Sequence, residues 1–381
     1  MDHKQKFFLF KQSKNFCAVP WNHVKIDVDG EVRTCVKGTE VLGNINQQSL
    51  ASILQSPVLA QIRQDLVADR ATPNCQRCRS LDNQSESGQY RYLKDMYNDL
   101  FVKSPVDYND ATQFVLSGVD LHWSSTCNLK CVTCWARQSS AIAQEAHIPI
   151  LTVDRTRADQ VVDWIVSNQQ HLREVYLSGG EPTLIKHNLR LLQQLTPRED
   201  LLLRVNTNMT FEPDNVIMRE LLKFPRVLIT ASADALGKRF EYIRQGADWN
   251  KFLANLDWLS KTHVQWRLNS VFFVASAAGL LHTQDFFRQQ YGFDDFTINQ
   301  CSMEQHSLMA RNLPVSVKTN LIKTFEQEIH TRVQDRNLVG QLENCIAELT
   351  QESNGVSYQE YFGSIDQRRG TCWHQVFEEL A

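Results

Sequence analysis

The chain has 381 residues, of which 42% are hydrophobic and 22% charged, with a formal net charge of −3. This length suggests two or three domains with a sizeable core, and the charge gives no global basic field for nucleic acid or anionic membranes. No segment approaches the roughly 20 apolar residues that span a bilayer, and the apolar stretch 7–10 is too short for a signal peptide. We therefore expect a cytoplasmic globular protein.

The first predicted elements form a β-hairpin followed by a helix. Polarity alternates over residues 24–28 and 31–35, on either side of the pair Asp29-Gly30, which is a strong hairpin signal. Apolar residues then recur at helical intervals over 49–68. The polar stretch 82–89 is expected to be a linker.

From about residue 118, predicted strands and helices alternate. The strands are expected at 119–123, 174–177, 201–206, 226–232, 265–274 and 295–300, and the helices near 155–170, 186–195, 214–224, 249–261 and 282–291. Repeated β-α units predict a parallel sheet with helices outside it, and six units form only part of a barrel. Residues 315–352 also show a helical pattern.

These elements predict an α/β fold with three parts. The predicted fold is a partial (β/α)6 TIM-like barrel over residues 112–305, preceded by a small hairpin and helix module over 1–95. A helical C-terminal extension over 306–381 is expected to pack on the barrel.

Ten cysteines are the most informative residues of the chain. In a large chain without an export signal, metal or cofactor ligation is favoured over disulfides. Cys301, Cys345 and Cys372 are scattered, which is typical of small buried hydrophobes. The other seven are clustered in two groups: Cys17, Cys35, Cys75 and Cys78, then Cys127, Cys131 and Cys134.

The second cysteine group follows the first predicted barrel strand with the spacing C-x3-C-x2-C. Three thiolates on one short loop can hold three corners of a cubane iron–sulfur cluster and leave the fourth iron open. After the next strand comes Gly179-Gly180-Glu181-Pro182. Two glycines let the backbone approach a ligand closely, and the carboxylate can accept hydrogen bonds from an ammonium group.

With these two motifs one β-α unit apart, residues 118–300 resemble the radical S-adenosylmethionine superfamily. The resemblance implies that Cys127, Cys131 and Cys134 bind a [4Fe-4S] cluster whose open iron is chelated by S-adenosylmethionine. Reduction of that cluster releases a 5′-deoxyadenosyl radical, which abstracts hydrogen from a substrate. No catalytic residue is implied beyond the cluster ligands.

The same resemblance assigns the contacts to S-adenosylmethionine. Gly179, Gly180 and Glu181 would seat the methionyl amine. Asn208 lies in a sequence similar to the family's Thr-Asn-Gly, with Met209 in place of the glycine. The remaining expected contacts are Ser232 and Asp234, which resemble the family's Ser-x-Asp, and Arg244, which follows Tyr242-Ile243 as in peptide-modifying members. One further departure is Thr133, where the family often has an aromatic residue.

The first cysteine group resembles the SPASM and twitch modules, which carry auxiliary iron–sulfur clusters. The match is the spacing from Cys17 through Gly30 to Cys35, which Cys75-x2-Cys78 completes to four thiolates. Four sulfurs suit tetrahedral zinc as well as a second [4Fe-4S] cluster, so both remain open. The segment 362–373 resembles a recurring ending of proteins with an N-terminal twitch module and could pack back across the barrel.

The expected function is oxidative modification or cross-linking of a peptide or protein, with the auxiliary cluster as electron acceptor. A reducing partner such as flavodoxin or ferredoxin is expected, whereas nucleic acid and membrane partners are not. The alternatives are a twitch-type dehydrogenase or an enzyme that modifies a nucleotide or other small molecule. A non-enzymatic zinc or iron–sulfur module is a further alternative, against which the Gly-Gly-Glu element argues.

Overall fold

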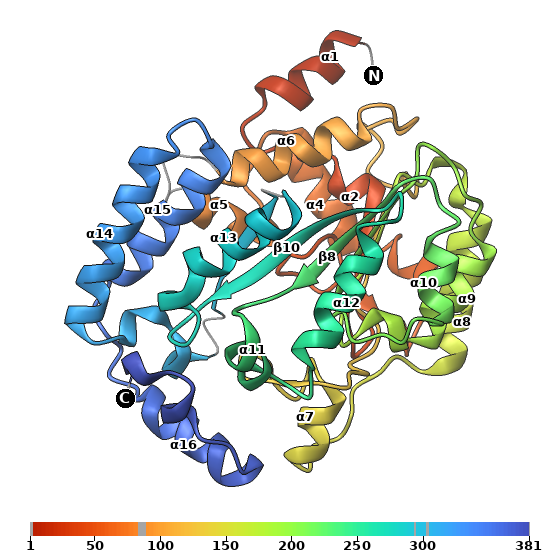
Figure 1. Ribbon diagram of the computed structural model, residues 1–381. Coiled ribbons are helices and arrows are strands. Elements are labelled where there is room, and N and C mark those ends of the chain that lie inside the picture. Colours follow the sequence, from red (N-terminus) through yellow and green to blue (C-terminus); the bar gives the residue numbers. More distant parts are fainter. Residues whose placement is uncertain (1–2, 83–88, 293–294, 302–304, 381) are drawn as a thin grey trace.

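The computed structural model describes residues 3–82, 89–292, 295–301 and 305–380, and its centre is one large twisted sheet flanked by helices (Figure 1). The strand order is β11-β10-β8-β7-β6-β4-β1-β2-β3, and β5 and β9 form a separate pair. The strands are β1 (His23–Ile26), β2 (Glu31–Arg33), β3 (Gly43–Asn44), β4 (Gly118–Leu121), β5 (Lys130–Cys131), β6 (Glu174–Leu177), β7 (Leu202–Thr207), β8 (Val227–Ser232), β9 (Arg244–Gln245), β10 (Gln265–Phe272) and β11 (Phe296–Gln300).

Six neighbouring strands, from β4 to β11, pair in parallel. One face of this sheet carries aliphatic side chains such as Val175, Leu203 and Ile229, which are completely buried in the main core. The helices between and after these strands are α7 (Ser140–Glu145), α8 (Arg155–Ser167), α9 (Lys186–Gln194), α10 (Val216–Leu221), α11 (Gly237–Ile243), α12 (Trp249–Leu259) and α13 (Leu280–Tyr291). The predicted α/β fold with six β-α units is therefore confirmed.

The N-terminal hairpin extends the barrel sheet. Strand β1 pairs with β2 in antiparallel fashion and with β4 in parallel, so that His23 lies opposite Gly118 and Ile26 lies opposite Leu121. Around it lie α1 (His3–Phe7), a π-helix η1 (Phe8–Gln12), α2 (Val19–Asn22), α3 (Leu50–Ile53), α4 (Pro57–Val67), a 3-10 turn η2 (Pro73–Cys75), α5 (Gln76–Asp82) and α6 (Gln89–Phe101).

The prediction of a single helix over 49–68 is wrong, because the chain forms two helices there, α3 and α4, with a break between them. Pro57 has no backbone N–H and occupies the first turn of α4, where that donor is not needed. The Ser56 side chain accepts a hydrogen bond from the Leu59 backbone N–H and caps the new helix. Most of the linker predicted at 82–89 lies outside the described residues.

The C-terminal extension consists of α14 (Val315–Thr331), α15 (Arg336–Thr350) and α16 (Tyr358–Arg369), followed by the 3-10 turns η8 (Trp373–Gln375) and η9 (Glu378–Leu380). These elements share a second hydrophobic core with the end of β10, in which Phe272, Leu342 and Phe362 are fully buried. The helical pattern predicted over 315–352 covers α14 and α15 but misses α16.

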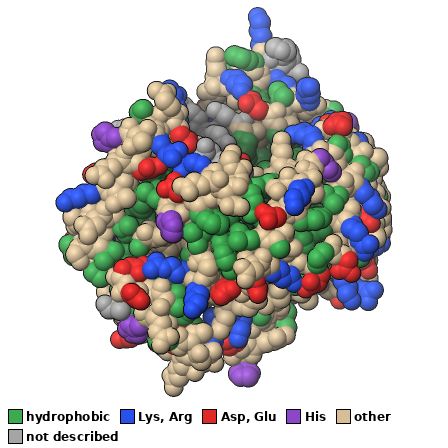
Figure 2. Space-filling view, in the orientation of Figure 1, with side chains coloured by type: hydrophobic (Ala, Val, Ile, Leu, Met, Phe, Trp, Pro, Cys, Tyr) green, Lys and Arg blue, Asp and Glu red, His purple; other side chains and the backbone are tan. Residues whose placement is uncertain are grey.

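The surface agrees with the near-zero net charge. In Figure 2, lysine and arginine side chains are interspersed with aspartate and glutamate over the face shown. Within the described part of the chain, every helix is too short or too polar to cross a bilayer.

Candidate functional site

The three cysteines of the C-x3-C-x2-C motif lie on one loop that leaves the carboxyl end of β4. Cys131 belongs to β5, whose backbone pairs in antiparallel fashion with β9 at Arg244. The Val132 backbone N–H extends this pairing by donating to the Ile243 carbonyl over 2.7 Å. The loop is thus fixed to the segment that follows α11, and the three thiols lie close enough to influence one another electrostatically.

Burial raises the pKa of the Cys131 thiol to about 12, and the nearby guanidinium of Arg244 opposes this effect. The side chain of Arg244 is 9% exposed and forms an ion pair with Asp234 over 2.9 Å. Because the thiolate is the ligand form of cysteine, a buried cation beside Cys131 favours ligation. The sequence motif places Arg244 near S-adenosylmethionine, and the structure places it beside the cysteine loop.

The glycine loop after β6 lies directly against the cysteine loop. Gly180 has a φ of +43°, and a β-carbon there would come within 2.2 Å of the Thr126 carbonyl oxygen. Gly179 has a φ of +80°, and a β-carbon there would come within 1.8 Å of the His122 ring. Both positions therefore require glycine, for its backbone freedom and for its lack of a side chain.

Glu181 joins the ends of β6 and β7. Its Oε1 accepts hydrogen bonds from the Thr183 hydroxyl and backbone N–H and from the Thr207 hydroxyl, over 2.7 to 3.1 Å. Its Oε2 accepts one hydrogen bond, from the Asn208 backbone N–H over 2.8 Å. Oε2 thus has one protein donor against three at Oε1, so it is the oxygen with acceptor capacity left for a further donor, such as an ammonium group.

Asn208 connects the end of β7 to the cysteine loop. Its Nδ2 donates to the Asn128 side-chain oxygen over 3.1 Å and lies 4.0 Å from the Cys127 sulfur. The next residue, Met209, has a φ of +59°, which is the left-handed conformation that favours glycine. Met209 thus adopts a conformation that suits glycine, the residue that the family often has at this position.

Asp234 connects Arg244 to strand β10 of the barrel sheet. Its side chain is fully buried, and Oδ1 accepts a hydrogen bond from the Val271 backbone N–H over 2.8 Å. Ser232 ends β8 opposite Asn269 of β10. Of the expected contacts after β8, Asp234 and Arg244 are therefore brought together next to the cysteine loop, and Ser232 lies on the neighbouring sheet edge.

The four N-terminal cysteines line one pocket, as their spacing predicts. Its other lining residues include Thr34, Lys94 and Tyr97. Burial raises the pKa of Cys75 to about 12, and the neighbouring Cys35 and Cys78 contribute to this rise. Four thiols that reach this pocket from the segments around α2, β2, η2 and α5 suit a cofactor held by several thiolates.

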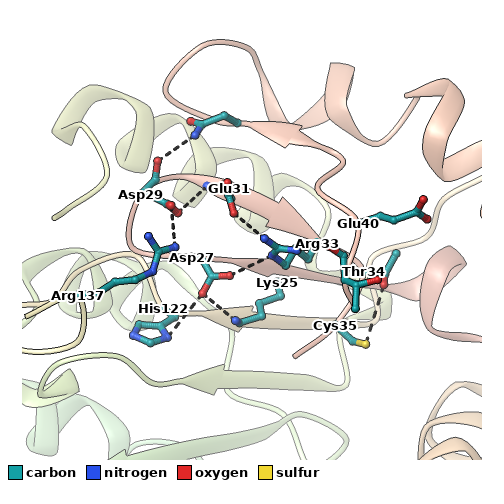
Figure 3. A network of polar contacts seen from close by, with 12 residues as sticks. Lys25, Asp27, Asp29, Glu31, Arg33, Thr34, Cys35, Glu40, His122 and Arg137 are labelled. Atoms are coloured by element: carbon teal, nitrogen blue, oxygen red, sulfur yellow. Dashed lines mark hydrogen bonds and ion pairs between the residues drawn. The ribbon is translucent and has the colours of Figure 1, made fainter. Parts of the chain in front are cut away.

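The hairpin turn of the N-terminal module also contacts the cysteine loop, through a polar network that the sequence does not reveal (Figure 3). Arg137, three residues after Cys134, forms an ion pair with Asp29 in the turn over 2.7 Å. Lys25 and Asp27 of the hairpin form a second pair over 2.7 Å, and His122 lies 3.8 Å from Asp27. The residues that flank the two cysteine groups are thus joined by charged contacts.

Polar residues also occupy the inner face of the sheet, opposite the aliphatic face. Lys25, Asp120, Tyr176 and Arg204 occupy directly paired positions on β1, β4, β6 and β7. Burial raises the pKa of Asp120 to about 7, and its side chain accepts a hydrogen bond from Ser178. Barrel interiors are usually filled by bulky apolar residues, so this face is suited to a polar ligand.

Within the described residues, no group of three or more His, Cys, Asp or Glu side chains is arranged to hold a single metal ion. A cubane cluster places its cysteine ligands on separate iron corners, and thiolates are its usual ligands. The donor chemistry of both cysteine groups therefore fits iron–sulfur clusters. Cys345 is fully buried in the second core, and Cys301 is also buried there. Gln305 contacts both the Cys301 sulfur, over 3.5 Å, and the Cys134 carbonyl, over 3.4 Å, so one side chain separates Cys301 from the cysteine loop.

The two regions that carry the cysteine groups each match a family model. The family model of the SPASM iron-sulfur cluster-binding domain matches residues 17–79, and the model of the radical SAM superfamily matches residues 121–272. No curated protein matches the chain.

The solved structures that match this chain share little sequence with it. The structure "Native anSMEcpe with bound AdoMet" is 18% identical, with a TM-score of 0.43 over 56% of this chain and 62% of that one. Streptococcus suis SuiB bound to the precursor peptide SuiA is 14% identical, with a TM-score of 0.41 over 81% of this chain and 69% of that one. The matched region thus spans less than two thirds of anSMEcpe. The two family-model matches show that the chain carries a radical S-adenosylmethionine domain, preceded by a SPASM iron–sulfur cluster-binding domain.

Proposed function

We propose that this protein carries out a net oxidation of its substrate, with two iron–sulfur clusters in different roles. Cys127, Cys131 and Cys134 would hold the cluster with the open iron, and S-adenosylmethionine bound there supplies the 5′-deoxyadenosyl radical. Cys17, Cys35, Cys75 and Cys78 would hold a second cluster without an open iron. A flavodoxin or ferredoxin would reduce the first cluster.

The observation that carries this proposal is the pocket lined by the four N-terminal cysteines. A cluster ligated by four thiolates has no iron left to bind a substrate, which leaves electron transfer as its role. The module that holds this pocket adds its strand β1 to the barrel sheet next to β4, and the cysteine loop leaves the carboxyl end of β4. This continuity supports a fixed separation between the two clusters, as electron transfer requires.

The residues around the first cluster would hold S-adenosylmethionine in the following way. The backbone of Gly179 and Gly180 would face the methionyl group, and the free acceptor site on Glu181 Oε2 would take its amine. Asn208 would hold the cysteine loop against this site through its contact with Asn128. Arg244, in its ion pair with Asp234, would keep positive charge beside Cys131.

The preferred substrate is a peptide or protein side chain, because Tyr242-Ile243-Arg244 resembles the sequence of peptide-modifying members. A small polar molecule is the second candidate, and the inner face of the sheet favours it. Ionisable side chains lie there at paired strand positions, namely Lys25, Asp120 and Arg204. Such groups would bind a substrate with hydroxyl, amine or acidic groups more favourably than a substrate with an apolar side chain.

Iron and sulfide analysis of anaerobically purified protein tests the two-cluster proposal. We expect about eight irons per chain. The triple variant Cys127→Ala, Cys131→Ala, Cys134→Ala should keep about four, and so should the variant in which Cys17, Cys35, Cys75 and Cys78 are alanine. Stoichiometric zinc in place of the second set of irons would disprove the auxiliary cluster.

Radical chemistry is tested separately, without knowledge of the substrate. Reduced protein incubated with S-adenosylmethionine should release 5′-deoxyadenosine, and the triple cysteine variant should not. If the wild-type protein with its full iron content releases none, the proposed enzyme activity is wrong. A screen of peptides against hydroxylated and acidic small molecules, read out as stimulation of this release, then separates the two substrate classes.

A further inference from the structure

The C-terminal helix α16 reaches back to the cysteine loop and binds its backbone. The Tyr361 hydroxyl donates to the Val132 carbonyl over 3.0 Å, and Arg369 Nη1 donates to the Lys130 carbonyl over 2.9 Å. These two carbonyls lie on either side of Cys131. More than 220 residues of chain separate the donors from the acceptors, so this contact is a product of the tertiary fold.

Arg369 is held in place by a buried ion pair. Its Nη2 and Nε donate to both carboxylate oxygens of Glu145 on α7, over 2.8 to 3.2 Å. Only 4% of the Arg369 side chain is exposed, against 16% for Glu145. Lys130 of the cysteine loop adds a second ion pair to Glu145 over 3.0 Å. Arg369 therefore joins α16, α7 and the cysteine loop in one network, at the end of the molecule where Figure 1 shows α7 and α16.

The same helix is anchored in the second hydrophobic core. Phe362 is fully buried there and packs near Trp373, with ring centres 5.7 Å apart. Asp366 accepts hydrogen bonds from the Tyr242 hydroxyl over 3.0 Å and from the Trp373 backbone N–H over 2.7 Å. Because these contacts fix the helix, Tyr361 and Arg369 meet the cysteine loop as donors in set positions.

We propose that α16 acts as a clamp that holds the cysteine loop in its cluster-binding shape, with Arg369 and Tyr361 as positioning residues. The inference rests on the proposed function, in which Cys127, Cys131 and Cys134 hold a cluster. Arg369 has a second effect through its charge. A buried cation beside a cluster stabilises the added electron, because the reduced cluster is more negative.

The test compares Arg369→Ala with a matched control elsewhere in the same tail. Arg239 of α11 and Glu379 of η9 also form a two-bond ion pair, over 2.7 Å each, that ties the tail to the barrel without touching the cysteine loop. Arg239→Ala therefore also removes a two-bond ion pair of the tail, although the Arg239 side chain is 35% exposed and that of Arg369 only 4%. The readouts are iron per chain, the rate of iron loss to a chelator, and the midpoint potential of the cluster followed by electron paramagnetic resonance.

We expect Arg369→Ala to lose about four of about eight irons per chain, or to release them at least about tenfold faster than wild type. The midpoint potential of the cluster held by Cys127, Cys131 and Cys134, measured on the protein that retains it, should become more negative. Tyr361→Phe removes one hydrogen bond and should raise the release rate about fivefold at unchanged potential. Arg369→Lys keeps the charge but not the fork of donors, so its potential should stay near wild type while iron release accelerates. Arg239→Ala should match wild type.

Two different failures can be told apart. If the wild-type protein and the triple cysteine variant hold the same iron, the trio binds no cluster and the proposed function fails. If the trio does bind a cluster but Arg369→Ala and Tyr361→Phe match Arg239→Ala in iron release and potential, the clamp is wrong. Circular dichroism of each variant confirms that the chain remains folded.

Discussion

Gly180→Ala should disrupt the seat for S-adenosylmethionine without removing any cluster ligand. The new β-carbon would lie 2.2 Å from the Thr126 carbonyl oxygen, which is too close for non-bonded atoms. That oxygen accepts a hydrogen bond from the Glu181 backbone N–H over 2.8 Å. Relief of the clash must therefore move two backbone segments and weaken the bond that joins the glycine loop to the cysteine loop.

The expected cost has two parts. Alanine at a φ of +43° costs about 1–2 kcal/mol relative to glycine, and a broken backbone hydrogen bond adds about 1 kcal/mol. Gly237→Ala isolates the first part, because Gly237 has a φ of +54° and no atom within 4 Å of the added β-carbon. We therefore expect Gly180→Ala to lose about 2–3 kcal/mol and Gly237→Ala about 1–2 kcal/mol of unfolding free energy.

Urea unfolding under anaerobic conditions measures these losses, and equilibrium dialysis measures affinity for S-adenosylmethionine. Affinity should fall at least about tenfold in Gly180→Ala and stay unchanged in Gly237→Ala. Gly179→Ala offers an internal check, because its clash is with the movable ring of His122. Adding His122→Ala should restore binding in that variant. The reasoning would be refuted if Gly180→Ala bound S-adenosylmethionine as tightly as the wild type and had the unfolding free energy of Gly237→Ala.

Three further predictions concern buried ionisable groups. Burial raises the pKa of Asp120 from 3.8 to about 7, so ionisation of this side chain opposes folding as the pH rises through that window. Asp120→Asn should therefore raise the free energy of unfolding by up to about 4 kcal/mol at pH 8 and leave it unchanged at pH 4. Urea unfolding at both pH values measures the difference, and equal effects at the two would contradict the prediction. Burial lowers the pKa of His23 from 6.5 to about 4, so the stability that neutral His23 contributes is complete above pH 6.5 and falls by about 1.4 kcal/mol per pH unit below it. His23→Gln should therefore reduce the pH dependence of the unfolding free energy between pH 7 and 5. A curve parallel to that of the wild type would exclude His23 as the cause. The buried guanidinium of Arg63 donates two hydrogen bonds to the Pro20 carbonyl beside the N-terminal cysteine pocket, so Arg63→Ala should lower the free energy of unfolding by about 3 kcal/mol. Iron content should fall as well, and full iron content would show that Arg63 does not support that pocket.

The sequence allowed most of the barrel strands to be predicted to within about two residues, because they are short apolar runs separated by helical patterns. It also located both cysteine groups, since their spacing is local. The role of Glu181 as a joint between β6 and β7 was not predictable, because its hydroxyl partner Thr207 comes from another strand. The three domains predicted from the sequence stay a prediction.

Contacts between distant segments account for the rest. The ion pair of Arg137 with Asp29 spans 108 residues, and the Asp29-Gly30 turn signal says nothing about which partner its carboxylate meets. The contact of Arg369 with the Lys130 carbonyl spans 239 residues and uses a helix that has little hydrophobic periodicity. Such pairs depend on how the layers of the fold stack, which local patterns do not encode.

The pairing of β1 with β4 has a consequence for how the chain folds. The N-terminal hairpin is synthesised first, but β1 gains its parallel neighbour only after about 90 more residues have been made, since β4 begins at Gly118. Until then the hairpin has an open edge, and without the hairpin β4 would itself become the exposed edge of the barrel sheet. Exposed strand edges promote aggregation. A fragment that begins at the barrel should therefore be poorly soluble, and the two halves of the enzyme should mature together.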